Sequence, residues 1–82
     1  DIREVKRLSF PAEVVMMAYS TQEDLLAFGL SDGSVVVFSP DFELSAAFQA
    51  FDSPVTALAF SPDDRFLAAA SGDGLKVFVV RP

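Results

Sequence analysis

The chain has 82 residues, 51% of them hydrophobic, and its twelve acidic and six basic residues give a net charge of −6. It contains neither cysteine nor histidine, which excludes disulfide bonds and removes the most common metal ligand. The acidic balance argues against nucleic-acid binding, because that function needs a basic surface to approach phosphates. No apolar run reaches the roughly 18–20 residues of a membrane-spanning helix. We therefore expect neither nucleic acid nor membrane as a partner.

The first predicted strand covers residues 3–10 and contains half of the basic residues of the chain. Its basic residues are Arg3, Lys6 and Arg7, and its apolar residues are Val5, Leu8 and Phe10. From residue 13 onward, ten of the twelve acids follow but only three of the six bases, so a basic segment precedes an acidic body. The segment lacks the apolar core of a secretory signal, and we expect a cytoplasmic protein.

Seven further short apolar segments follow, each bounded by turn residues. They predict strands at residues 14–20, 25–30, 34–39, 43–50, 55–60, 66–71 and 75–80. Residues 35–38 and 77–80 are rich in β-branched and aromatic side chains, as strands are. Pro, Gly and Asp fill the connections in turn-forming combinations, and we interpret Asp63 and Asp64 as a solvated turn. No segment repeats its apolar residues with the helical period, which favours an all-β protein.

The sequence repeats itself with a period of 41 residues. Identical pairs at this offset include Phe10 and Phe51, Val14 and Val55, Ala18 and Ala59, and Ser20 and Ser61. After the Asp-Gly turn that both copies share, the second copy is one residue shorter, because Val37 matches Val77 at an offset of 40. Each copy spans four short strands, the pattern of a four-stranded antiparallel unit. We expect Phe42 and Phe51 to cap the spaces between the units rather than to anchor a partner.

Parts of both copies resemble WD40 repeats, which build β-propellers. Residues 55–68, with a Ser-Pro-Asp turn at their centre, resemble the first half of such a repeat. Residues 31–38 and 71–78 resemble the second half, with Phe38 where the family usually has Trp. The family's network of His, Ser or Thr, Asp and Trp cannot form here, so the resemblance implies only a turn-forming role for Asp32 and Asp73. It implies two four-stranded antiparallel propeller blades held mainly by apolar packing.

The family's strand order places the start of the chain outside the first blade. We assign residues 1–12 to an outer strand that completes another blade, 13–50 to the first blade, and 51–82 to a second blade without its outer strand. A closed ring then needs either other copies of the chain or a longer parent chain. For self-assembly we expect strand exchange among three or four copies, with four preferred. The residues expected to mediate it are Val5, Leu8, Phe10, Leu75, Val77 and Val79.

The residues provide no pattern for catalysis, and we expect no cofactor and no metal. The carboxylates and hydroxyls show neither a nucleophile–base pair nor the spacing of a calcium loop. The loops support a better hypothesis, docking of basic or polar protein segments on one face of the blades. Its residues are Glu13, Asp32, Asp52, Ser53 and Asp73, whereas Glu23, Asp24, Asp41, Glu43, Asp63 and Asp64 belong to the other face. Two alternatives are acidic loops that only maintain solubility, and a purely structural or engineered propeller fragment without a ligand.

Overall fold

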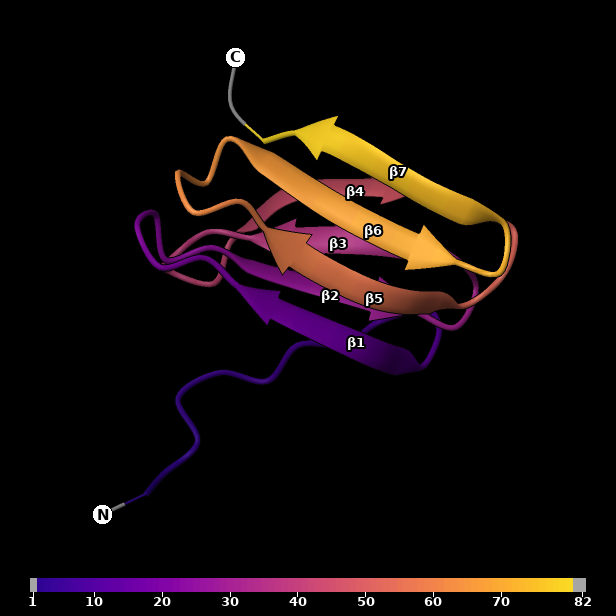
Figure 1. Cartoon of the computed structure of the whole chain (residues 1–82). Coiled ribbons are helices and arrows are strands. Elements are labelled where there is room, and N and C mark those ends of the chain that lie inside the picture. The colour runs from indigo at the N-terminus through magenta and orange to yellow at the C-terminus, as the bar shows by residue number, and fades with distance from the viewer. Residues whose placement is uncertain (1, 81–82) are drawn as a thin grey trace.

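The structure is a computed structural model that describes residues 2–80, and these residues form two antiparallel β-sheets (Figure 1). The first sheet contains β1 (Val14–Tyr19), β2 (Leu26–Leu30), β3 (Ser34–Phe38) and β4 (Leu44–Gln49). The second contains β5 (Val55–Phe60), β6 (Phe66–Ser71) and β7 (Gly74–Val79). Within each sheet, every strand lies beside the next one along the chain. The all-β class and seven of the eight predicted strands are confirmed. Within residues 2–80, no helix has the length and apolar character needed to cross a membrane.

The pairing of the strands reproduces the sequence repeat. Ala27 of β2 pairs with Val37 of β3, and Ala68 of β6 pairs with Val77 of β7. The residues on β2 and β6 are 41 apart and those on β3 and β7 are 40 apart, which confirms the one-residue deletion in the second copy. Both β1 and β5 also carry an irregularity in register near their first residue. The two sheets are therefore copies of one unit.

The sheets pack face to face through one hydrophobic core. β1 and β2 contact β5, while β4 and β7 meet through Phe48 and Phe78, whose ring centroids lie 4.7 Å apart. The buried residues of this core are Ala27, Val35, Val37, Ala50, Phe51, Val55, Leu67 and Ala69. A Cβ at Gly29 would lie 2.5 Å from Val55 Cγ1, so the missing side chain permits the close approach of β2 to β5. Phe51 is 4% exposed and packs between the sheets as predicted.

The outer face of the first sheet carries a smaller apolar cluster, which the N-terminal segment partly covers. The Phe10 ring centroid lies 5.1 Å from that of Phe28 and 5.9 Å from that of Phe38. Leu8 packs on the same cluster. Three aromatic rings in tilted and edge-to-face contact stabilise this arrangement beyond the area that they bury.

The predicted strand at residues 3–10 is wrong for this structure, because residues 2–13 contain no strand. A strand needs a neighbouring strand to satisfy its backbone hydrogen bonds. Here Leu8 and Phe10 lie on the face of a sheet instead of along an edge, and Val5 is 74% exposed. In Figure 1 the N-terminal part of the segment extends below β1 and away from both sheets. The assignment of residues 1–12 to an outer strand of another blade stays a prediction.

The second sheet has three strands, as predicted, and its outer face is bare. Leu75, Val77 and Val79 are 69%, 60% and 66% exposed. Lys76 and Phe78, which alternate with them along β7, contact Phe51 and Phe48 of the other repeat. Within residues 2–80, β6 is the only strand that pairs with β7. The sequence of four strands and then three agrees with the predicted blades, while closure of a ring stays a prediction.

Candidate functional site

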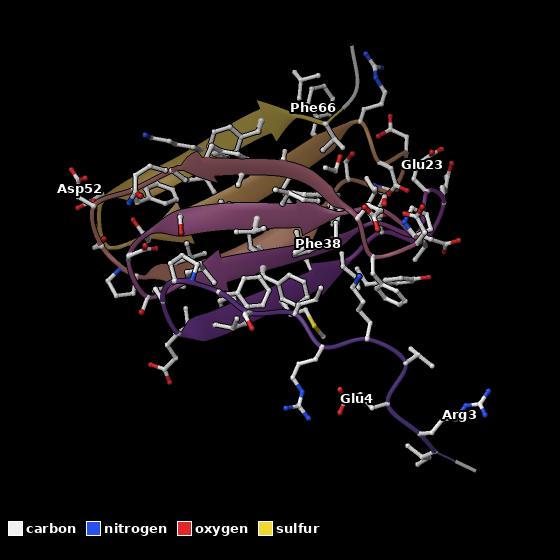
Figure 2. The ribbon with its side chains drawn as sticks, turned by 180° about the vertical axis from the view of Figure 1, so that it is seen from behind. Arg3, Glu4, Glu23, Phe38, Asp52 and Phe66 are labelled. Carbon is white, nitrogen blue, oxygen red and sulfur yellow. The ribbon has the colours of Figure 1, made fainter. Side chains whose placement is uncertain are left out.

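Several chain connections meet at one end of the two sheets and carry the predicted partner-binding residues. We call this set, Glu13, Asp32, Asp52, Ser53 and Asp73, the acidic end. Glu13 is tied to the β2–β3 turn, because its N–H donates to Ser31 Oγ at 3.2 Å and its carbonyl accepts from the Ser31 N–H at 2.8 Å. The Asp52 N–H donates to Asp73 Oδ2 at 3.3 Å, which joins the β4–β5 connection to the β6–β7 turn. Figure 2 shows Asp52 and Glu23 at opposite ends of the molecule.

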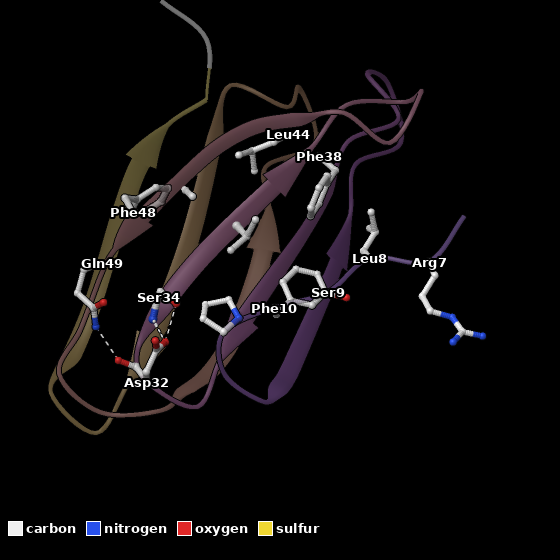
Figure 3. A pocket seen from close by; sticks show the side chains of 13 residues that line it. Arg7, Leu8, Ser9, Phe10, Asp32, Ser34, Phe38, Leu44, Phe48 and Gln49 are labelled. Atoms are coloured by element: carbon white, nitrogen blue, oxygen red, sulfur yellow. Dashed lines mark hydrogen bonds between the residues drawn. The ribbon is translucent and has the colours of Figure 1, made fainter. Parts of the chain in front are cut away.

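Gly33 and Gln49 hold the backbone of the acidic end. The N–H groups of Ala50 and Phe51 both donate to the Gly33 carbonyl, at 3.1 and 3.0 Å. Gly33 has a φ of 88°, and a Cβ there would lie 2.0 Å from the Phe51 carbonyl oxygen, so only glycine fits. Gln49 Nε2 donates to the carbonyl of Asp32 at 2.6 Å, as Figure 3 shows, and to that of Phe51 at 2.6 Å. These bonds fix the backbone from which the acidic side chains project.

A polar cavity of about 410 Å³ opens between the sheets at the acidic end. Its lining residues are Gln49, Ala50, Phe51, Asp52, Asp73 and Lys76. Lys76 Nζ donates to the Ala50 carbonyl at 2.8 Å and lies 5.2 Å from the centroid of the Phe51 ring, in reach of a cation–π contact. The cavity therefore combines two carboxylates, one ammonium group and an aromatic ring. Sequence reasoning missed Lys76, although the residue is the only charged side chain in the apolar strand β7.

Hydrogen bonds from Ser34 favour the ionised form of the Asp32 carboxyl group. Its Oδ1 accepts hydrogen bonds from the Ser34 hydroxyl at 2.5 Å and from the Ser34 N–H at 3.0 Å (Figure 3). Because these bonds favour the charged carboxylate, they lower the pKa of Asp32 from its ordinary value of 3.8. Across residues 2–80, no group of three or more Asp, Glu, His or Cys residues is placed to hold a metal ion. The acidic end therefore presents negative charge and hydrogen-bond acceptors at neutral pH.

The other acidic residues lie at the opposite end, and one of them is buried. Glu23, Asp24, Asp41, Glu43 and Asp63 are exposed. Asp64 is 1% exposed, and its Oδ2 accepts the N–H of Gln22 at 2.9 Å and that of Glu23 at 2.8 Å. The predicted solvated turn is therefore wrong for Asp64, which joins the β5–β6 connection to the β1–β2 connection of the first sheet. Its φ of 59°, a conformation that Asp tolerates, permits this orientation.

Two exposed carboxylates of this opposite end, those of Asp41 and Asp63, accept hydrogen bonds within their own turns. The Ser39 hydroxyl donates to Asp41 Oδ1, and the Ser61 hydroxyl donates to Asp63 Oδ1 at 2.7 Å. Each bond lowers the pKa of the carboxyl group that accepts it. Asp63 Oδ1 also accepts the N–H of Arg65 at 3.1 Å. These acids therefore stabilise local turns, as the Ser-Pro-Asp pattern predicted.

The predicted self-assembly residues occupy the two outer faces of the molecule. Leu8 and Phe10 lie on the first sheet, and Leu75, Val77 and Val79 lie on the second. Beside Phe10, a groove of about 780 Å³ remains open on the first sheet (Figure 3). Val36, Phe38, Leu44 and Ala47 form much of its apolar lining, and Arg7 lines it as well. Both outer faces thus expose apolar surface, and the structure does not bring their residues together.

Two antiparallel meander sheets that repeat every 40–41 residues and pack face to face define a pair of β-propeller blades. The chain belongs to the WD40-repeat family: the model of the anaphase-promoting complex subunit 4 WD40 domain matches residues 17–80. This confirms the family resemblance seen in the sequence. The chain is also similar to abnormal embryogenesis protein 30 of Caenorhabditis elegans, with 36% identity over 76 residues. The match covers 79% of this chain but 7% of that relative, so the chain corresponds to a small part of the relative's length.

Proposed function

We propose that the chain is a non-catalytic WD40 scaffold whose acidic end docks basic or polar segments of other proteins. The observation that supports this most directly is that Asp52 and Asp73, which the Asp52 N–H joins by a hydrogen bond to Asp73 Oδ2, both line one polar cavity. The matched family is named for a subunit of a multiprotein complex, which agrees with a role in protein assembly. In this function the loops contact the partner protein, and the two sheets hold the loops in a fixed arrangement.

The geometry of the acidic end suits recognition of a lysine or arginine side chain. Asp52 and Asp73 lie on the wall of the cavity, and Asp32 keeps its charge at neutral pH. Lys76 donates to the Ala50 carbonyl and lies beside the Phe51 ring, and within residues 2–80 it forms no salt bridge with Asp52 or Asp73. A cationic side chain from a partner would be attracted by these carboxylates, and complementary charge would also accelerate encounter.

The test is binding of a fluorescent lysine- and arginine-rich peptide to the chain, followed by anisotropy. We expect affinity to fall steeply as salt rises, because exposed charges are screened. Asp52→Asn and Asp73→Asn keep an acceptor oxygen but remove a charge, and each should weaken binding. The matched control is Glu43→Gln at the opposite end, which removes one charge as well. Equal losses in all three variants, or an affinity independent of salt, would refute docking at the acidic end.

A second candidate function is self-association by strand exchange, the role expected for the outer faces. The observation in its favour is β7, whose Leu75, Val77 and Val79 side chains are more than half exposed and whose second edge has no paired strand within residues 2–80. Such an edge is a template for pairing with another chain. Native mass spectrometry tests this: rings of three or four copies are expected, and a monomer at every concentration would refute it. A monomer that also binds no peptide would favour a purely structural fragment.

A further inference from the structure

We propose that Ser9 is a phosphorylation site for a serine kinase that selects basic residues before the acceptor. Three bases precede this serine: Arg7 by two residues, Lys6 by three and Arg3 by six. An aromatic residue, Phe10, follows it directly. Kinases distinguish their substrates by the charge pattern around the acceptor, and carboxylates in a peptide-binding cleft form strong hydrogen bonds with such bases. The sequence around Ser9 therefore complements a kinase whose cleft is acidic.

The Ser9 hydroxyl group is accessible and is not engaged elsewhere. Ser9 is exposed and lies outside the strands. Within residues 2–80, its hydroxyl group forms no hydrogen bond. By contrast, the hydroxyl groups of Ser34, Ser39 and Ser61 each donate to an aspartate two residues away. Those aspartates would also repel the carboxylates of an acidic cleft, so Ser9 is the better acceptor.

The segment around Ser9 can enter a kinase cleft without the loss of a strand pairing. Residues 2–13 contain no strand, and Leu8 and Phe10 hold the segment to the first sheet through apolar contacts. Figure 3 shows Arg7 extending away from the strands, and its side chain is 79% exposed. Its ion pair with Glu4, at 2.9 Å, is exposed as well and contributes little stability, so a kinase carboxylate can replace Glu4. A segment held by so few contacts opens more readily than the core.

The transfer uses ATP and Mg²⁺, which the kinase binds. Ser9 Oγ attacks the γ-phosphorus of ATP, so an Oγ–P bond forms while the bond from that phosphorus to the bridging oxygen of the β-phosphate breaks. The electron pair of the broken bond leaves with ADP. The hydroxyl proton passes to the catalytic aspartate of the kinase.

Phosphorylation of Ser9 would remove the basic character of the N-terminal segment. Residues 2–12 carry three bases and one acid, a net charge of +2. A phosphoserine adds about −1.5 to −2 at neutral pH, so the segment becomes nearly neutral. The chain from residue 13 onward carries ten acids and three bases, and its attraction for the segment would fall accordingly. Modification of Ser9 thus changes the charge of this segment while both sheets stay intact.

The test is phosphorylation of the whole chain by the catalytic subunit of cyclic-AMP-dependent protein kinase, with ATP and Mg²⁺. We expect one phosphate per chain, located on Ser9 by tandem mass spectrometry, and none on the Ser9→Ala variant. Arg7→Gln removes one base next to the acceptor and should lower kcat/KM about tenfold. The matched control, Arg65→Gln, removes one base in the β5–β6 connection and should leave kcat/KM unchanged.

Three results would overturn the proposal. They are a phosphate on another hydroxyl group in place of Ser9, no phosphate at all, and equal losses of kcat/KM in Arg7→Gln and Arg65→Gln. Circular dichroism separates lost recognition from lost structure, because Arg7 and Arg65 are both exposed and their variants should keep the β signal of the wild type.

Discussion

Gly29→Ala should destabilise the contact between the two blades. The new Cβ would lie 2.5 Å from Val55 Cγ1 and 2.7 Å from Val55 Cβ, distances that require β2 or β5 to move. Overpacking of a dense core costs about 1–3 kcal/mol. The lower backbone entropy of Ala in the unfolded chain returns only about 0.4–1 kcal/mol. We therefore expect net destabilisation, measured as a lower midpoint of thermal unfolding by roughly 4–8 °C for each kcal/mol.

The matched control is Gly72→Ala, since a Cβ at Gly72 meets no atom closer than 3.7 Å, that of Ser53 Oγ. This variant should unfold within a few degrees of the wild type. Val55→Ala removes the Cγ1 and Cγ2 atoms that obstruct residue 29, so the double variant should lose less stability than the sum of the two single variants. Equal midpoints for Gly29→Ala and Gly72→Ala, or strict additivity in the double variant, would refute the close packing of β2 on β5.

Three further predictions concern the connections. Gly33→Ala places a Cβ 2.0 Å from the Phe51 carbonyl oxygen, at a φ of 88° that L residues rarely adopt. The variant should lower the free energy of unfolding, measured in urea, by at least about 2 kcal/mol. An unchanged urea midpoint would contradict the turn geometry. Asp64→Ala removes the carboxylate that accepts the N–H groups of Gln22 and Glu23, so amide exchange at residues 22 and 23 should accelerate more than exchange in β7. Slow amide exchange at residues 22 and 23 in this variant would contradict the role of Asp64 in joining the two connections. Three carboxyl groups, those of Asp32, Asp41 and Asp63, have pKa values below the ordinary 3.8 because serine hydroxyls donate to them. These groups stabilise the folded state at any pH above their pKa in the unfolded chain, and this contribution is lost as pH falls through their lower pKa values in the folded chain. The free energy of unfolding should therefore decline below about pH 4. Ser34→Ala removes the hydroxyl donor to Asp32 and should make that decline shallower.

The 41-residue repeat made most of the fold predictable. Alternating short segments and turn residues located seven strands, and the shift from 41 to 40 placed the deletion in the correct turn. Local pattern sufficed because, within each sheet, every strand pairs with its neighbour along the chain, so the pairing did not depend on distant segments. The repeat also placed Phe51 between the blades, where it is buried.

The sequence predictions failed for residues whose contacts come from a distant part of the chain, because the neighbouring sequence does not specify those contacts. Residues 3–10 have the composition of a strand but no edge to pair with in the single chain, so Phe10 packs on a sheet face. Asp64 looks like a surface turn residue until the other blade supplies two N–H groups. Lys76 acquires its place in the cavity from Phe51 and Ala50, which lie in the other repeat. These contacts belong to the interface between blades, which short-range pattern does not describe.

The most direct test of docking at the acidic end is a heteronuclear NMR titration of the labelled chain with a lysine-rich peptide. The account predicts that amide shift changes concentrate at Glu13, Asp32, Asp52, Ser53 and Asp73 and vanish at high salt. Changes centred on Asp41 and Asp63 at the opposite end, or the absence of any change, would contradict it.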